Sequence, residues 1–261
     1  MKIAILGAGA MGGALAKGLL KGSIFKPEDI VIANPHRGKL EEFDFLGMQT
    51  TTDNCIAVDG AQLIAIVVKP WLVEQVINEI KPVLNYQQQI IINIAAGISS
   101  NTLFTWLDKD GTKPALFQVI PNIAIAYRAS MSFIVPCKAN EKQTILVKSL
   151  FDDMGQSLIT DEEHLAAGTT LASCGIAYAM RYVRAAAEGG VELGFKADTA
   201  TTIVLQTLQG AVSLLQGTGL HPEAAIDQVT TPKGLTIKGL NAMENAGFTN
   251  AVIQGLKAST K

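Results

Sequence analysis

The chain has 261 residues, of which 48% are hydrophobic and 17% are charged, and its net charge is −2. This length allows one large domain or two ordinary ones, and this composition excludes a disordered chain. The balanced charge leaves no broad basic surface, so neither nucleic acid nor a membrane is expected as a partner. Three widely spaced cysteines without a CxxC pair indicate reduced thiols in a cytoplasmic protein rather than a metal site.

The first part of the chain alternates between short apolar runs and amphipathic stretches. Strands are predicted at 2–7, 29–34, 63–68, 89–96, 115–121, 132–137 and 157–160, and helices at 14–22, 36–47, 71–84 and 141–154. Strands that are apolar on both faces and alternate with helices predict a parallel sheet covered on both sides.

Strand patterns end near residue 160, and alanine-rich helical segments follow. Six helices are predicted, at 161–173, 176–194, 198–216, 222–229, 234–246 and 248–258. We therefore predict an α/β Rossmann-type dinucleotide-binding domain at 1–160 and an all-α domain at 161–261. Because the later helices carry few charges, they need cover on most of their circumference. A second copy of the chain is the expected cover, and a compact monomeric bundle is the alternative.

The segment IAILGAGAMGGALAKGL places the pattern GxGxxG between a predicted strand and a predicted helix. Gly7 permits a tight turn, Gly9 lets a pyrophosphate approach the backbone, and Gly12 lets the helix pack closely on the strand. The start of that helix offers unpaired N–H groups and the positive end of its dipole to phosphate. The residues assigned to cofactor binding here are Leu6, Gly7, Ala8, Gly9, Ala10, Met11 and Gly12.

The end of the second predicted strand bears on the choice of cofactor. NAD sites place Asp or Glu there to bind the ribose 2′-hydroxyl, whereas this chain has Asn34, with His36 and Arg37 close behind. The Arg37 guanidinium can hold a 2′-phosphate, which a carboxylate would repel. NADPH is therefore favoured over NADH, with these three residues in its site. The alternative is that Arg37 only begins a solvated helix face.

Seven segments resemble the pyrroline-5-carboxylate reductase family over nearly the full length of the chain. They are GAGAMG (7–12), VVKP (67–70), IAAGI (94–98), IPN (120–122), AEGGVELG (187–194), HPEAAIDQVTTPKGLTIKGL (221–240) and GF (247–248). The most specific match is TTPKGLT (230–236), which is similar to the family's Thr/Ser-Ser-Pro-Gly-Gly-Thr-Thr signature. The resemblance implies NADPH-dependent reduction of 1-pyrroline-5-carboxylate to L-proline, the last step of proline biosynthesis. It also implies a homodimer, or a larger homo-oligomer, formed through the helical domain.

The resemblance places the substrate, a small anionic cyclic imine, at the late loop. Backbone N–H groups of Gly234, Leu235 and Thr236 at a helix start would bind its carboxylate. The Thr236 hydroxyl would face the ring nitrogen as the candidate catalytic group, with water as the alternative proton donor. The other residues implied are Gln228, Val229 and Thr231 for the substrate, and Asn54, Val67, Val68, Lys69, Pro70, Ile94, Ala95 and Ala96 for the cofactor. Without the resemblance, Thr231 would be an ordinary helix N-cap.

Hydride transfer to a protonated imine depends mainly on aligning two rings. The sequence shows no Ser-His-Asp set, metal cluster or carboxylate pair, and His164 and His221 are expected to be structural. Hydroxyacid dehydrogenases place a catalytic lysine early in their second domain, but residues 161–195 contain no lysine.

Three segments depart from the family's pattern. ASCGIA (172–177) stands where the family has Ser-Gly-Ser-Gly-Pro-Ala, and QVIPNI (118–123) has Gln118 in place of an Arg and Ile123 in place of a Thr. Lys233 replaces a Gly of the late loop. Two alternatives therefore stay open: a reductase for a related cyclic imine or a hydroxyacid, and a paralogue that binds NADPH without catalysis.

Overall fold

The computed structural model describes residues 1–260 and divides into two compact units, Met1–Ser173 and Cys174–Lys261. The sequence predicted a boundary at residue 160. Unit 1 continues past that point because it retains helix α7 (Glu162–Gly168), whose Leu165 is buried with Ile120 and Val135 of the sheet. A π-helical turn at Thr169–Cys174 follows α7.

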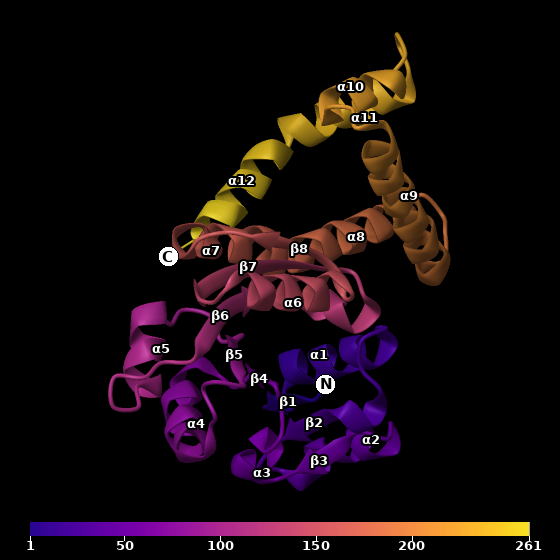
Figure 1. Ribbon diagram of the computed structural model, residues 1–261. Coiled ribbons are helices and arrows are strands. Elements are labelled where there is room, and N and C mark those ends of the chain that lie inside the picture. The colour runs from indigo at the N-terminus through magenta and orange to yellow at the C-terminus, as the bar shows by residue number, and fades with distance from the viewer. Residues whose placement is uncertain (261) are drawn as a thin grey trace. The chain divides into compact units, whose positions relative to one another are not determined.

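Unit 1 is built on an eight-stranded sheet with the order β3-β2-β1-β4-β5-β6-β7-β8 (Figure 1). The strands are β1 (Ile3–Leu6), β2 (Ile30–Ala33), β3 (Gln49–Thr51), β4 (Leu63–Ile66), β5 (Ile90–Asn93), β6 (Ala115–Ile120), β7 (Ser130–Lys138) and β8 (Gly155–Ile159). Neighbouring strands run parallel except β6 and β7, which are antiparallel. Every residue of β1, β2, β4 and β5 is buried, as expected for strands covered on both faces.

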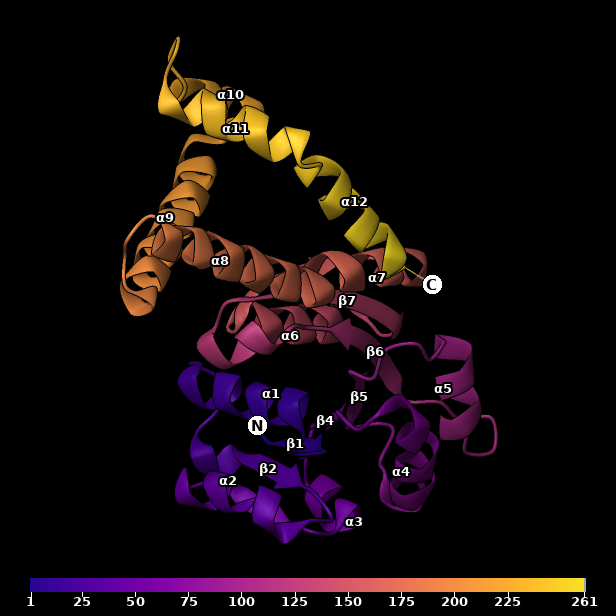
Figure 2. The same cartoon turned by 180° about the vertical axis from the view of Figure 1, so that it is seen from behind.

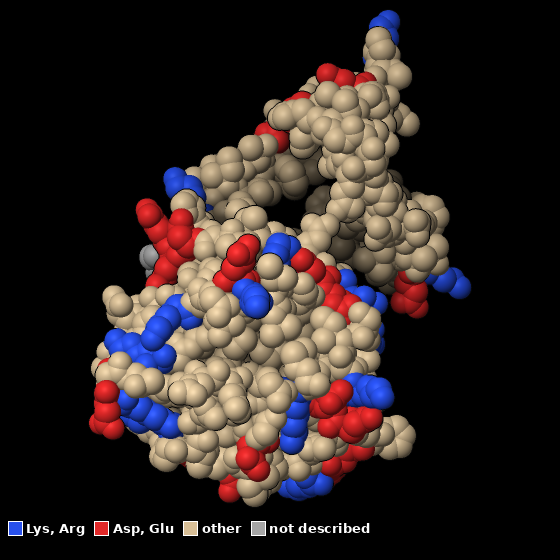
Figure 3. All heavy atoms as spheres, viewed as in Figure 1, with Lys and Arg blue, Asp and Glu red and all other residues tan. Residues whose placement is uncertain are grey.

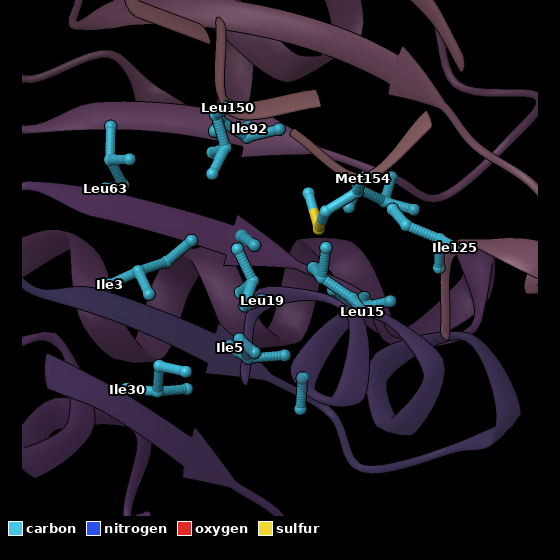
Figure 4. Packing of buried hydrophobic residues seen from close by; sticks show 14 of the residues in the cluster. Ile3, Ile5, Leu15, Leu19, Ile30, Leu63, Ile92, Ile125, Leu150 and Met154 are labelled. Carbon is cyan, nitrogen blue, oxygen red and sulfur yellow. The ribbon is translucent and has the colours of Figure 1, made fainter. Parts of the chain in front are cut away.

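Helices cover both faces of this sheet and create two separate cores. One core holds side chains from α1 (Ala10–Lys21), α2 (Glu41–Phe45) and α6 (Glu141–Asp152). The other holds side chains from α3 (Asn54–Val58), α4 (Val73–Ile80) and α5 (Ser100–Leu107). Figure 4 shows Leu15 and Leu19 of α1 in the first core, between the strand residues Ile3 and Ile5 and the side chain of Met154. The predicted α/β Rossmann-type class is confirmed.

Several local predictions for unit 1 were wrong. The strand β3 and the helices α3 and α5 were missed, since β3 is short and polar and α3 has only five residues. The predicted helix 36–47 is a 3-10 turn at Arg37–Lys39 followed by the short α2. The predicted helix 71–84 is α4 flanked by 3-10 turns at Pro70–Leu72 and Lys81–Val83, each with a proline in its first two positions, where proline fixes the backbone.

Unit 2 contains five helices and, among its described residues, no strand, as predicted. They are α8 (Gly175–Glu192), α9 (Ala197–Thr218), α10 (Pro222–Gln228), α11 (Leu235–Asn245) and α12 (Phe248–Ala258). Helices α8 and α9 contact each other and cross at a steep angle (Figure 2). Gly219 ends α9 in the left-handed conformation, and Pro222 occupies the first turn of α10, where its missing N–H costs nothing.

Unit 2 has almost no core of its own. Ala200 and Ala225 are the only buried residues among those described there, while Leu193 is 83% exposed and Leu205 is 53% exposed. Figure 3 shows few charged side chains on the visible face of this helical unit. Apolar exposure on this scale marks an interaction surface. None of the described helices is both long and apolar enough to cross a membrane.

Candidate active site

The residues assigned to the cofactor from the sequence lie along one edge of the unit 1 sheet, at the carboxyl ends of its strands. Backbone hydrogen bonds join these strand ends in a row: Asn34 N–H to Thr51 O (3.2 Å), Gly7 N–H to Ala33 O (2.9 Å), Val67 N–H to Leu6 O (2.9 Å) and Ile94 N–H to Ile66 O (2.9 Å). Strand β1 lies between β2 and β4, so the strand order reverses at Gly7. Open α/β sheets bind nucleotides at such a reversal point.

Each of the three glycines in the GxGxxG pattern is required for a different steric reason. Gly7 has a φ of +114°, and a Cβ there would lie 2.8 Å from the carbonyl oxygen of Val67. A Cβ on Gly12 would overlap the carbonyl oxygen of Gly7, so α1 could not approach β1. Gly9 is exposed, and apart from its chain neighbours and the nearby backbone of α1, no heavy atom of the described residues lies within 4 Å of where a Cβ would be, so the space beside its backbone is open.

The start of α1 can receive an anion at this open space. Gly9 is the N-cap of α1 and provides no side-chain cap, and the first turn contains no acidic residue. The first N–H groups of a helix have no partner within the helix, and they carry the positive end of its dipole. The loop therefore fits the pyrophosphate of a dinucleotide.

Arg37 lies near the end of β2 and is held in place by two residues that sequence reasoning missed. Its Nη1 donates to Thr50 Oγ1 (2.6 Å), and its Nη2 donates to Asp44 Oδ2 (2.5 Å). Asn34 is buried and its Oδ1 accepts from the exposed His36 N–H (3.0 Å). No sequence signal pointed to Thr50, because β3 shows no apolar pattern.

The remaining cofactor candidates of unit 1 also lie at this edge. Asn54 begins α3, directly after β3, and its Nδ2 donates to Glu79 Oε2 (2.8 Å). Val67 to Pro70 follow β4, with Lys69 exposed, and Ile94 to Ala96 follow β5, with Ala96 exposed. The structure thus brings the whole predicted set for the cofactor together within unit 1.

A cavity of about 200 Å³ adjoins Ala96. Its lining includes Ser99, Gln118, Glu162 and Thr169. Gln118, one of the departures from the family's pattern, is 2% exposed, and its Nε2 has no hydrogen-bond partner among the described residues. Oδ1 of Asn93 also has no hydrogen-bond partner among the described residues, and Asn93 lies opposite Gln118 in the pairing of β5 with β6. Buried amide atoms without hydrogen-bond partners are rare in folded proteins. Asn93 was not among the site residues predicted from the sequence.

A segment that carries the resemblance and one that departs from it meet at the π-helical turn Thr169–Cys174. The Asn122 Nδ2 donates to the carbonyl of Ala172 (3.3 Å), and the Ser173 Oγ donates to the carbonyl of Pro121 (3.0 Å). These bonds join IPN (120–122) to the first residues of the divergent ASCGIA segment. Single π-helical turns occur frequently at functional sites.

The late loop of unit 2 connects α10, which ends at Gln228, to α11, which begins at Leu235. Gly234 is the N-cap of α11 and makes no side-chain cap, so the alternative that Thr231 caps this helix is wrong. The Gly234 N–H donates to the carbonyl of Thr231 (2.9 Å) and is therefore already engaged. Leu235 and Thr236 are the first two residues of α11 and are exposed, so their N–H groups are the ones placed to bind an anion. Val229 and Thr231 are exposed as well.

Lys233 adopts a backbone conformation that suits glycine better. Its φ is +65°, in the left-handed region, where the family's pattern has Gly. At the next position, a Cβ on Gly234 would lie 2.9 Å from the carbonyl oxygen of Thr231 and closer still to its hydroxyl. The loop therefore tolerates a side chain at position 233 but has no room for one at Gly234.

Lys233→Gly is expected to stabilise the protein by about 1 kcal/mol, because the left-handed conformation costs a side-chain-bearing residue about 1–2 kcal/mol and part of this gain is offset by the greater freedom of Gly when unfolded. Chemical unfolding at one fixed protein concentration measures the change. Lys238→Gly in α11 is the matched control and should lose about 1 kcal/mol. A Lys233→Gly variant that is less stable than the original would contradict the assignment of strain.

Two of the three cysteines have raised pKa values. Burial raises the pKa of the Cys137 thiol to about 11, and burial also raises the pKa of Cys55, so neither is a ready nucleophile at neutral pH. His221 is the N-cap of α10, and the His164 ring contacts the N-cap carboxylate of Asp161 (2.8 Å). Both histidines thus take part in helix N-caps.

The glycine-rich edge of the unit 1 sheet and the helical unit that follows define an oxidoreductase built on a dinucleotide-binding domain. The model of the family described as NADP oxidoreductase, coenzyme F420-dependent, matches residues 2–97. The model described as pyrroline-5-carboxylate reductase dimerisation matches residues 162–261. Pyrroline-5-carboxylate reductase of Methanosarcina acetivorans is 33% identical, over 99% of this chain and 96% of the relative. The chain belongs to the pyrroline-5-carboxylate reductase family.

Two further similarities extend over the full chain. Pyrroline-5-carboxylate reductase 1 of Dictyostelium discoideum is 36% identical over 99% of this chain, which spans only 48% of that relative's length. The solved structure of Plasmodium falciparum pyrroline carboxylate reductase with NADP bound has a TM-score of 0.90 at 23% identity, covering 100% of this chain and 95% of that one. The latter likeness shows that the two chains share one fold.

Proposed function

We propose that this chain reduces 1-pyrroline-5-carboxylate to L-proline with NADPH. The proposal rests on membership of the family together with one observation, the open space beside Gly9. There the uncapped N-terminus of α1 lies at the carboxyl ends of the strands of unit 1. NADPH, when bound, supplies the hydride from C4 of its nicotinamide, and the residues of the chain bind and align the two reactants.

Each part of the cofactor has candidate residues on the sheet edge. The backbone from Leu6 to Gly12 holds the pyrophosphate, and Arg37 holds the 2′-phosphate with His36 and Asn34 beside it. Asn54 binds the adenosine ribose. Val67 to Pro70 and Ile94 to Ala96 lie along the rest of the dinucleotide. The exposed Ala96 and the cavity that it lines are suited to the nicotinamide end, since Ile98, Ile120 and Leu165 in the lining help to keep water from the transferred hydride.

The late loop supplies the substrate contacts in the assembled protein. The N–H groups of Leu235 and Thr236 bind the carboxylate of the imine, and Gln228, Val229 and Thr231 line the pocket. The Thr236 hydroxyl bonds the ring nitrogen and is the candidate group to protonate it, regaining its proton from water. Binding the carboxylate with backbone groups avoids a free cation, which would oppose the protonated ring.

The protein acts as a homodimer, or a larger homo-oligomer, through unit 2. The extensive apolar exposure of α8 to α12 supports this assembly, since a monomer would leave that surface in water. Three free cysteines fit a cytoplasmic location.

Arg37→Ala is expected to weaken NADPH binding about 10- to 100-fold and to leave NADH binding unchanged, since charged hydrogen bonds contribute roughly 1.5–3 kcal/mol. Calorimetric titration with both cofactors measures the ratio of the two affinities. Lys142→Ala on α6 removes the same charge far along the chain and should not change that ratio. If Arg37→Ala leaves the preference for NADPH intact, the 2′-phosphate assignment is wrong.

Rescue of a proline auxotroph tests the proposed activity in a cell. Expression of the chain should restore growth without added proline, whereas the Gly12→Ala variant should not, because a Cβ on Gly12 overlaps Gly7. Soluble expression without growth would count against the proposal and in favour of a paralogue that binds NADPH without catalysis.

A further inference from the structure

The guanidinium of Arg37 belongs to a closed network that joins three elements of unit 1. Arg37 lies in the 3-10 turn after β2, Asp44 in α2 and Thr50 in β3. The Thr50 hydroxyl accepts from Arg37 Nη1 (2.6 Å) and donates to Asp44 Oδ1 (2.5 Å), while Asp44 Oδ2 accepts from Arg37 Nη2 (2.5 Å). Each of the three side chains therefore contacts the other two.

These bonds use one particular edge of the guanidinium. Thr50 and Asp44 together occupy the end formed by Nη1 and Nη2. A guanidinium has five N–H donors, and the side formed by Nε and the second hydrogen of Nη2 is the other edge that can bind an oxyanion in a bidentate manner. The Nε has no hydrogen-bond partner among the described residues, and the side chain of Arg37 is 58% exposed.

We infer that Thr50 and Asp44 are positioning residues for cofactor selectivity, which fix Arg37 so that its Nε edge faces the 2′-phosphate of NADPH. The inference rests on the proposed function, in which Arg37 recognises that phosphate. Arginine has many rotamers, and a free side chain would lose that freedom on binding the phosphate. The network restricts the rotamers before the cofactor arrives, so less entropy is lost on binding.

Thr50 gives the cleaner test, because replacing it changes no charge. Thr50→Val removes the hydroxyl and is expected to lower the preference for NADPH over NADH about fivefold, the usual size for one hydrogen bond. Thr50→Ser keeps the hydroxyl and should retain the original preference. Thr52→Val, two residues along and exposed, is the matched control and should change nothing. Calorimetric titration of the full-length protein with NADPH, NADH and adenosine 2′,5′-bisphosphate measures binding without turnover.

Two comparisons separate a failure of this inference from a failure of the proposed function. In an Arg37→Ala background, Thr50→Val should have no further effect on the preference, because Thr50 acts through Arg37. If Arg37→Ala lowers the preference but Thr50→Val leaves it unchanged, the inference is overturned and the 2′-phosphate assignment stands. If neither variant changes the preference, both fail. An NADH affinity equal to that of the original protein shows that Thr50→Val has not disturbed the rest of the site.

Discussion

Replacing Thr236 with valine is expected to lower kcat about 100-fold while leaving the affinity for NADPH unchanged. Valine has nearly the same shape but no hydroxyl, so the ring nitrogen of the substrate loses its hydrogen-bonding group, and positioned proton donors typically contribute about 10²- to 10⁴-fold. Initial rates of NADPH oxidation with 1-pyrroline-5-carboxylate, together with NADPH titration, measure the two quantities separately. Because Thr236 is exposed on the first turn of α11, this change should leave the fold intact.

Thr236→Ser is the control for this prediction. Serine retains the hydroxyl at the same place, so most of the activity should return. If Thr236→Val turns over as fast as the original protein, the hydroxyl is not required and water protonates the nitrogen instead.

The second large effect is expected at Gly9. Gly9→Ala should weaken NADPH binding about 10- to 100-fold, because its methyl group would enter the space assigned to the pyrophosphate and such overpacking costs about 1–3 kcal/mol. The fold should lose no more than about 1 kcal/mol, the usual cost of replacing a favourable N-cap with Ala. Titration with NADPH and chemical unfolding measure the two effects.

Gly12→Ala provides the contrast. Its methyl group would overlap the carbonyl oxygen of Gly7 within the protein itself, so both stability and NADPH binding should fall. A Gly9→Ala variant with unchanged affinity for NADPH would show that the open space beside Gly9 is not the phosphate site.

The sheet and its glycine-rich edge could be predicted from the sequence because their signals are local. Continuous apolar runs mark β1, β2, β4 and β5, and the spacing from Gly7 to Gly12 lies between a strand and a helix. The helical character of unit 2 was equally plain from its alanine-rich segments, which glycine and proline separate.

The parts of the fold and site that could not be predicted depend on contacts between elements, which leave no local pattern in the sequence. Strand β3 is polar and short, so neither Thr50 nor its bond to Arg37 could be expected from periodicity. Asp44 belongs to a helix that was predicted far too long. Asn93 is a polar residue within a buried strand, and its place opposite Gln118, where its Oδ1 has no partner among the described residues, depends on how β5 and β6 are aligned.

The late loop shows both the value and the limit of resemblance. The resemblance singled out the segment and assigned Thr236 and the Gly234 N–H to the substrate, whereas the residues alone suggested Thr231 as the N-cap. The structure places the cap at Gly234 and uses its N–H in a turn. The departure at Lys233 was visible in the sequence, whereas its left-handed backbone was not.

The most direct test is a stoichiometric assay of the purified protein with NADPH and 1-pyrroline-5-carboxylate, with proline measured alongside NADPH. One molecule of L-proline should form for each NADPH consumed, with slower turnover of piperideine-6-carboxylate and none of hydroxyacid or ketoacid pairs. A protein that binds NADPH in titration yet leaves it unoxidised in the presence of the pyrroline would contradict the proposed function.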